Sequence, residues 1–76
     1  MDAVMKKTYQ LENLDCANCA SKMETAVSKI SGVQSATVSF LTQKLVIEAD
    51  ESEFDRIIHD AVKVCKKIEP DCTVLL

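Results

Sequence analysis

The feature that most constrains this chain is the way its apolar residues change their spacing along the sequence. They alternate with polar residues in some stretches and recur every third or fourth position in others. Alternation is typical of a half-buried strand, and the longer spacing is typical of an amphipathic helix. Strands are predicted at residues 5–11, 33–40, 45–49 and 72–76, and helices at 17–30 and from Phe54 to before Pro70.

Turn and capping residues mark the ends of these elements. Gly32 supplies a stop signal after the first helix, and the short polar stretch 42–44 joins two strands into an antiparallel hairpin. Acidic residues and Ser52, a candidate N-cap, precede the second helix. Two lysines suit the negative end of the dipole of that helix, and Pro70 forbids its continuation.

The predicted order is β-α-β-β-α-β, in which the two halves repeat a strand-helix-strand plan. A split β-α-β arrangement places both helices on one face of a four-stranded antiparallel sheet, which is the ferredoxin-like fold of the α+β class. With 76 residues, 47% of them hydrophobic, the chain is long enough for one compact core and no more. We therefore expect residues 1–76 to form a single domain.

Charge and hydropathy exclude several classes of partner. The formal net charge is −3, whereas nucleic acids and anionic membranes select a clustered positive face. No run approaches the roughly 18 apolar residues of a membrane span, and the first residues lack the apolar core of a secretory signal. We therefore expect a soluble, cytoplasmic chain with no nucleic-acid partner and no direct membrane insertion.

The four cysteines stand in a chain whose periodicity is that of a hydrophobic-core domain. Small disulfide scaffolds are usually rich in loops, so reduced thiols and a cytosolic compartment are expected here. Cys65 continues the buried stripe of the second helix, and Cys72 begins an alternation with Val74 and Leu76. Core packing accounts for both. The loop before Cys72 should, however, lie at the same end of the sheet as the other thiols, so Cys72 is kept as a further candidate ligand.

The stretch NLDCANCA carries the chemistry, because Cys16 and Cys19 fall where the first strand ends and the first helix begins. A thiol there meets free backbone N–H groups and the positive end of the helix dipole, both of which favour the thiolate. Two thiolates three positions apart can turn toward one point and hold a soft metal ion. The spacing alone also fits a thiol-disulfide redox protein or half of a structural zinc site.

Asp15, directly before Cys16, favours one class of ion over another. Cu(I) accepts two soft sulfur ligands, whereas Zn²⁺ prefers four partners and readily accepts carboxylate oxygen. A carboxylate would also add unfavourable negative charge to a two-thiolate Cu(I) site. Asp15 is therefore predicted as a third ligand for a divalent ion, with helix capping or bonds to loop amides as the alternative.

Other candidate groups are given structural roles. Met23 lies in the apolar stripe of the first helix, where core packing is expected rather than thioether ligation. His59 falls on the polar face of the second helix, away from the thiols, and is expected to be solvated. The acidic residues at 50–55 indicate a solvated helix start and not an acid-base pair.

The stretches LENLDCANCASKME and ISGVQSATVSF resemble the heavy-metal-associated domain. This domain is a small ferredoxin-like module that occurs as soluble metal chaperones and at the N-termini of heavy-metal-transporting P-type ATPases. The resemblance covers almost the whole chain. Cys16 and Cys19 match the metal-binding cysteines of the family signature G-M-x-C-x-x-C. Asn13 and Leu14 replace the Gly and Met; the resemblance implies that Leu14 is a buried anchor, and Asn tolerates left-handed backbone better than most residues.

Copper-handling members of that family commonly carry Thr at the position of Asp15, whereas Asp there resembles zinc-, cadmium- and lead-exporting ATPases. The closing KKIEPD resembles the same branch. The resemblance thus implies a non-enzymatic domain that binds Zn²⁺, Cd²⁺ or Pb²⁺ and regulates, or delivers metal to, other domains of a heavy-metal efflux P-type ATPase.

Two alternative functions remain open. A Cu(I) (Cu⁺) chaperone or copper-ATPase domain is the first alternative, and a thiol-disulfide redox protein is the second. A monomer is expected, with a metal-bridged dimer as the alternative.

Overall fold

The structure, a computed structural model, describes residues 4–75 and confirms the predicted order of elements. Leu76, the last position of the predicted alternation with Cys72, lies outside the described residues. The strands are β1 (Val4–Glu12), β2 (Val33–Ser39), β3 (Lys44–Asp50) and β4 (Thr73–Leu75), and the helices are α1 (Ala17–Ser28), the short 3-10 helix η1 (Glu51–Glu53) and α2 (Phe54–Ile68).

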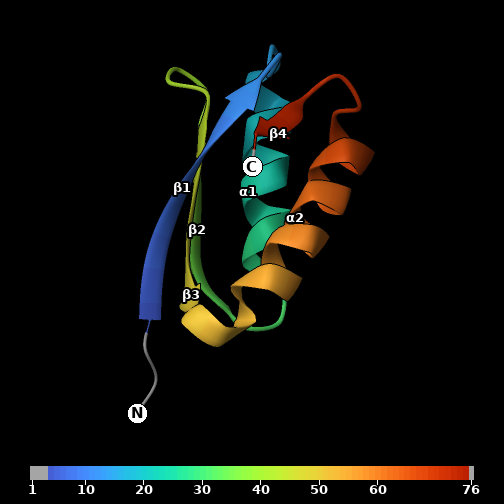
Figure 1. Cartoon of the computed structure of the whole chain (residues 1–76). Coiled ribbons are helices and arrows are strands. Elements are labelled where there is room, and N and C mark those ends of the chain that lie inside the picture. The colour runs from blue at the N-terminus through green and yellow to red at the C-terminus, as the bar shows by residue number, and fades with distance from the viewer. Residues whose placement is uncertain (1–3, 76) are drawn as a thin grey trace.

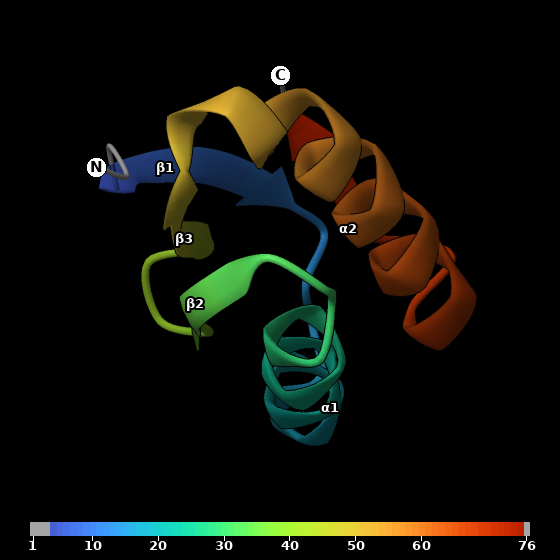
Figure 2. The ribbon, with the colours of Figure 1, turned by 90° about the horizontal axis from the view of Figure 1, so that it is seen from below.

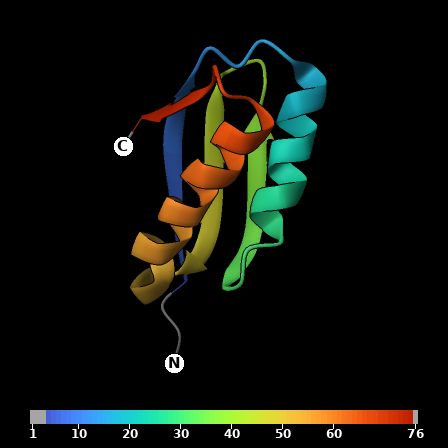
Figure 3. The same ribbon diagram turned by 90° about the vertical axis from the view of Figure 1, so that its right-hand side faces the viewer.

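The four strands form one antiparallel sheet in the order β2-β3-β1-β4. β1 pairs with β3 from Val4 to Gln10, and its last residues, Gln10 to Glu12, also pair with β4. Both helices lie to the same side of the sheet (Figures 2 and 3). This arrangement is the predicted ferredoxin-like fold.

The hydrophobic core fills the space between the sheet and the two helices. Each helix contributes one buried stripe, because its apolar residues recur at helical spacing. Met23 is fully buried, which confirms its predicted packing role. The strands add alternate residues, since successive side chains of a strand point to opposite faces. The most buried members are Leu11, Leu14, Ala20, Met23, Val27, Leu45, Ile47, Ala49, Phe54, Ile57, Ala61, Cys65 and Cys72.

The first helix ends two residues earlier than predicted, at Ser28 instead of residue 30. The backbone N–H groups of Lys29 and Ile30 donate to the carbonyls three residues before them, at 3.2 and 3.1 Å. Such bonds tighten the last turn of a helix into 3-10 geometry. Gly32 follows with a φ of 95°, which confirms it as the stop signal.

The prediction that Ser52 caps the second helix is wrong. The carboxylate of Asp50 instead accepts hydrogen bonds from the backbone N–H and the hydroxyl of Ser52, at 2.9 and 2.7 Å. These bonds lower the pKa of Asp50. The chain first forms the turn η1, and α2 then begins at Phe54 without a side-chain cap. The cap therefore moves upstream because a 3-10 turn precedes the helix.

Three connections meet at one end of the sheet: the β1–α1 loop, the β2–β3 turn and the α2–β4 loop (Figures 1 and 3). The backbone N–H of Leu11 donates to the carbonyl of Gln43 at 2.7 Å, which joins the end of β1 to the β2–β3 turn. The loop before Cys72 thus lies at the same end as the Cys16–Cys19 loop, as predicted.

Candidate metal centre

Cys16 and Cys19 are brought together by the start of α1. Cys16 is the N-cap residue, with extended backbone angles of −124° and 114°, and its Sγ accepts a hydrogen bond from the backbone N–H of Cys19 at 3.2 Å. A sulfur therefore takes the place that a Ser, Thr or Asp oxygen fills in most N-caps. Both side chains are half-buried, so each thiol keeps one side toward solvent.

The two thiols have opposite pKa shifts. Hydrogen bonds from the side chain and the backbone N–H of Cys19 lower the pKa of Cys16, and the N–H of Asn18 adds to this. The pKa of Cys19 rises to about 11, first because its thiol is hydrogen-bonded to Cys16, and then through burial and the charge of Cys16. The expectation that both thiols favour the thiolate is therefore met by Cys16 alone. Two adjacent negative charges repel, so Cys19 keeps its proton after Cys16 has lost its own.

Glu69 is a charged neighbour of the thiols that sequence reasoning missed. It follows the last residue of α2, and its carboxylate raises the pKa of Cys19 by hydrogen bonding and by charge. The same charge offsets part of the lowering of the Cys16 pKa, and it adds to the burial that raises the pKa of Cys72. The only signal for it was the position of KKIEPD in the α2–β4 loop, and no local pattern distinguished this acid from its neighbours.

Asp15 is exposed beside Cys16, and it does not cap the helix, because Cys16 fills that position. The capping alternative is therefore wrong. Within residues 4–75, no three His, Cys, Asp or Glu side chains are already placed to hold one metal ion. The structure thus brings two sulfurs close together, and ligation by Asp15 stays a prediction.

The other two cysteines lie in the core, with exposed fractions of 0% for Cys65 and 1% for Cys72. Burial is the main reason why the pKa of Cys65 rises to about 11, and burial also raises the pKa of Cys72. The core role of Cys65 is confirmed. Cys72 is buried, so its sulfur is not presented at the surface with the other two, and ligation by Cys72 stays a prediction. His59 is exposed on α2, as predicted for a solvated side chain.

The base of the thiol loop has the geometry that the resemblance implied. Leu14 is 1% exposed, which confirms it as a buried anchor. Asn13, just before it, has a φ of 64°, in the left-handed region that favours Gly and that Asn tolerates. The chain therefore turns sharply at Asn13, buries Leu14, and then presents Asp15 and Cys16 at the end of the sheet.

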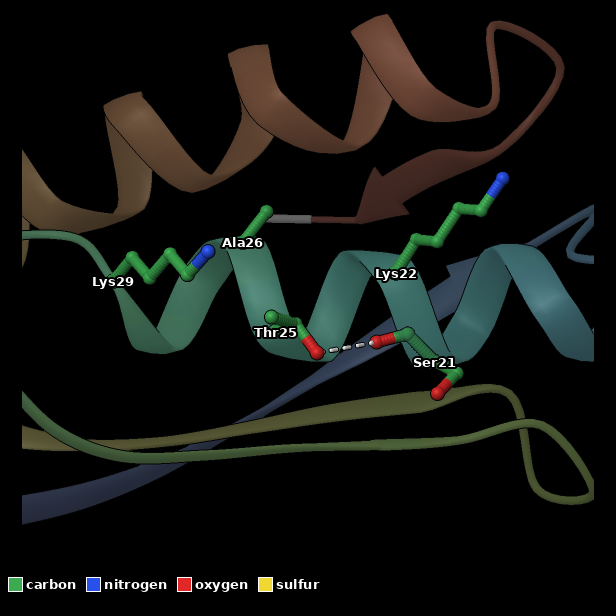
Figure 4. Close-up of a pocket in the computed structure, with 5 residues that line it drawn as sticks. All are labelled: Ser21, Lys22, Thr25, Ala26 and Lys29. Atoms are coloured by element: carbon green, nitrogen blue, oxygen red, sulfur yellow. Dashed lines mark hydrogen bonds between the residues drawn. The ribbon is translucent and has the colours of Figure 1, made fainter.

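A shallow hollow of about 320 Å³ lies along the outside of α1 (Figure 4). Its lining comes from one helix, and the hydroxyl of Thr25 donates to the carbonyl of Ser21 within it at 3.1 Å. The thiols do not line this hollow, so the candidate metal centre is an exposed loop. The lining residues are Ser21, Lys22, Thr25, Ala26 and Lys29.

Among residues 4–75, no helix combines the length and apolar character needed to cross a membrane.

Comparison with known proteins relates this chain to parts of metal-transporting ATPases. It is 37% identical over 71 residues to a cadmium, zinc and cobalt-transporting ATPase of Bacillus subtilis (strain 168), covering 93% of this chain and 10% of that protein. It is 44% identical over 43 residues to a zinc/cadmium/lead-transporting P-type ATPase of Escherichia coli (strain K12), covering 57% and 6%. The chain thus spans about a tenth or less of the length of these relatives.

Copper proteins are also among the similar proteins. The "Probable copper-transporting ATPase PacS" of Synechocystis sp. is 41% identical over 54 residues, covering 71% of this chain and 7% of that protein. The Cu(I)-loaded N-terminal domain of a potential copper-translocating P-type ATPase from Bacillus subtilis has a TM-score of 0.75 at 25% identity. That match covers 95% of this chain and 88% of the other.

A further solved structure supports the fold alone. Oxidized MerP from Ralstonia metallidurans CH34 has a TM-score of 0.74 at 22% identity, and the match covers 97% of this chain and 100% of the other. The family model of the heavy-metal-associated domain matches residues 8–69. This match includes the thiol loop, both helices and the hairpin between them. The chain therefore belongs to the heavy-metal-associated domain family.

Proposed function

We propose that this metal-binding domain takes up Zn²⁺, Cd²⁺ or Pb²⁺ through Cys16, Cys19 and Asp15. In this proposal it passes the ion to, or regulates, a heavy-metal efflux P-type ATPase, and it acts as a monomer without catalysis of its own. The observation that carries the proposal is the placement of both thiols at the exposed start of α1, where the backbone N–H of Cys19 donates to the Sγ of Cys16 at 3.2 Å.

The choice of a divalent ion rests on the oxygen donors around the sulfurs. Asp15 precedes Cys16 in the exposed loop, and the carboxylate of Glu69 acts on both thiols from the α2–β4 loop. Two carboxylates near two sulfurs suit Zn²⁺ and similar ions, which accept mixed sulfur and oxygen ligands. The same negative charge disfavours a Cu(I) ion that two thiolates already satisfy. Sequence similarity alone does not distinguish a divalent ion from Cu(I), since zinc and copper ATPases are both similar to this chain.

The exposure of the loop supports transfer as well as binding. Cys16 and Cys19 are half-buried and Asp15 is exposed, so a ligand from a partner protein can approach a bound ion directly. An ion with fewer than four protein ligands keeps an open position. A partner's ligand can therefore enter before a ligand of this domain leaves, and tight binding does not prevent release.

The test of the ion class is the substitution Asp15→Ala, with Asp71→Ala as the matched control. Asp71 is another exposed carboxylate at the same end of the molecule, so both variants lose one negative charge. We expect Asp15→Ala to weaken Zn²⁺ and Cd²⁺ binding by about tenfold or more and to leave Cu(I) binding within about twofold. Competition with chelators of known affinity measures all three ions.

Two results would contradict this function. Equal loss of divalent affinity in Asp15→Ala and Asp71→Ala would reduce the role of Asp15 to general charge. A wild-type protein that prefers Cu(I) in the same competition, unchanged by Asp15→Ala, would support the copper alternative, which the Cu(I)-loaded relative favours. The double variant Cys16→Ser/Cys19→Ser should lose binding of every ion.

A further inference from the structure

One glutamine from the β2–β3 turn holds the base of the thiol loop. The side-chain Oε1 of Gln43 accepts a hydrogen bond from the backbone N–H of Leu14 at 2.9 Å, and its Nε2 donates to the carbonyl of Leu14 at 2.6 Å. The same Nε2 donates to the carbonyl of Phe40 at 2.9 Å, within its own turn. A single carboxamide thus pairs with both backbone groups of Leu14, as a neighbouring strand would.

The hydrogen bonds from Gln43 to Leu14 lie just beyond the point where strand pairing of β1 ends. β1 ends at Glu12, and Asn13 then leaves the sheet in a left-handed conformation with a φ of 64°. Leu14 is the next residue, is 1% exposed, and has buried backbone groups that need partners. Gln43 supplies those partners from a position 29 residues further along the chain.

Gln43 itself adopts an unfavourable backbone conformation in order to do so. Its φ is 56°, which non-glycine residues other than Asn and Asp rarely adopt. Its carbonyl accepts from the backbone N–H of Leu11 at 2.7 Å and from Nε2 of Gln10 at 3.0 Å. The backbone of Gln43 is therefore tied to β1, while its side chain is tied to the thiol loop.

We propose that Gln43 is a positioning residue that fixes the loop backbone from which Cys16 projects, and that it thereby sets the metal affinity of the site. The proposal rests on the proposed metal-binding function and adds a residue that touches no metal. Leu14 lies two residues before Cys16, so a loose Leu14 would let the two sulfurs separate. Pre-ordering the loop removes that freedom before the ion arrives.

The chemistry of the side chain makes the proposal specific. The carboxamide accepts from the N–H of Leu14 through its oxygen and donates to the carbonyl of Leu14 through its nitrogen. Methionine has nearly the same length and the same backbone preferences as glutamine, but it lacks both functions. Asparagine keeps the carboxamide and tolerates a positive φ, but it is one methylene shorter. Gln43→Met therefore removes the polar atoms, and Gln43→Asn removes the reach without adding backbone strain.

The experiment compares both variants with the wild type and with Gln10→Ala as a control. The amide of Gln10 donates to the carbonyls of Leu11 and Gln43, at 3.2 and 3.0 Å, and not to Leu14. Three quantities are measured: the Cd²⁺ dissociation constant by chelator competition, the hydrogen-exchange rate of the Leu14 amide, and the thermal unfolding midpoint. Binding is measured well below that midpoint, so that all proteins are folded.

We expect Gln43→Met and Gln43→Asn to bind Cd²⁺ about tenfold more weakly than the wild type. The Leu14 amide should exchange about tenfold faster, and Gln10→Ala should match the wild type in both respects. A purely structural role would lower the unfolding midpoint and leave the affinity of the folded protein unchanged. Cd²⁺ affinity within twofold of the wild type in both variants would overturn the proposal, and so would unchanged exchange at Leu14.

Failure of the metal-binding function would give a different result. The wild type would then bind Cd²⁺ no better than Cys16→Ser/Cys19→Ser. The proposal that Gln43 sets the metal affinity would be rejected together with the metal-binding function. Both proposals are supported if the wild type binds Cd²⁺ through its cysteines and the Gln43 variants bind it more weakly while Gln10→Ala does not.

Discussion

Cys19 holds its proton more tightly than Cys16, because the side-chain hydrogen bond between them lowers the pKa of Cys16 and raises the pKa of Cys19 to about 11. A divalent ion held by both sulfurs takes the place of that proton, since thiolates are the ligating form. Uptake of metal at neutral pH is therefore coupled to release of the proton that Cys19 retains.

Zinc affinity should consequently fall as the pH falls. Protons compete with the metal for sulfur, so between the lowered pKa of Cys16 and the value near 11 for Cys19 each unit of acidification should weaken binding about tenfold. Below the pKa of Cys16 the dependence should become steeper, because two protons must leave. Calorimetric titration in buffers of several pH values measures this slope, and equal affinity throughout would exclude ligation by the thiol pair.

Replacing Glu69 by Gln should lower the pKa of Cys19. The carboxylate raises that pKa by hydrogen bonding and by charge, and Gln keeps the shape while it removes the charge. Asp71→Asn is the matched control, because it removes a nearby charge that does not act on either thiol. Thiolate absorbance in the ultraviolet, followed against pH, gives the result; an unchanged Cys19 titration would show that Glu69 is too far away to matter.

At the scale of elements, α1 has two separable tasks. Its N-terminus presents the thiols, and its buried stripe of Ala20, Met23 and Val27 fastens it to the sheet. The first task depends on backbone geometry at Cys16, and the second depends on apolar contact along the rest of the helix. Damage to the stripe should therefore change stability more than the chemistry of the loop.

Met23→Ala tests this separation. Met23 is fully buried, so truncation leaves a cavity and should cost about 3 kcal/mol of unfolding free energy. Met23→Leu nearly conserves the volume and should cost less than about 1.5 kcal/mol. Urea unfolding measures both values. The folded Met23→Ala protein should keep its metal affinity, and a loss as large as that of a cysteine variant would show that the two tasks are coupled.

At the scale of the whole molecule, the sheet order gathers the chemistry at one end. The end of the β1–α1 loop and the first turn of α1 carry the thiols, the β2–β3 turn carries Gln43, and the α2–β4 loop carries Glu69 and Cys72. The opposite end holds the α1–β2 turn around Gly32 and the turn η1. Metal binding should therefore be felt at one end of the molecule only.

One equivalent of Zn²⁺ should shift nuclear magnetic resonance signals in residues 14–20 and 68–72, with smaller changes at Gln43. Signals of Gly32 and of η1 should stay in place, because they lie at the far end of the sheet. A large shift at Cys72 would add its buried sulfur to the ligands. Shifts spread evenly over both ends would contradict a local site.

Sequence reasoning predicted most of the fold because the signals it uses are local. The period of the apolar residues identified each strand and helix, and turn residues such as Gly32 marked their ends. It failed at Ser52 because the 3-10 turn before α2 shifts the cap to Asp50, and residue spacing does not reveal such a turn. It was also wrong in assigning thiolate character to both cysteines. The pKa of Cys19 is raised by its side-chain hydrogen bond to Cys16, and residue spacing does not reveal this contact.

The sequence by itself thus determined the order of the elements and the placement of a Cys-x-x-Cys pair at the start of a helix, since both follow from neighbours in the chain. The tertiary structure alone decided which distant groups reach the loop that carries this pair. Gln43 and Glu69 reach the loop only because the strand order β2-β3-β1-β4 brings their turns to the same end of the sheet. Contacts of this kind depend on strand pairing across the whole chain, and no local pattern encodes them.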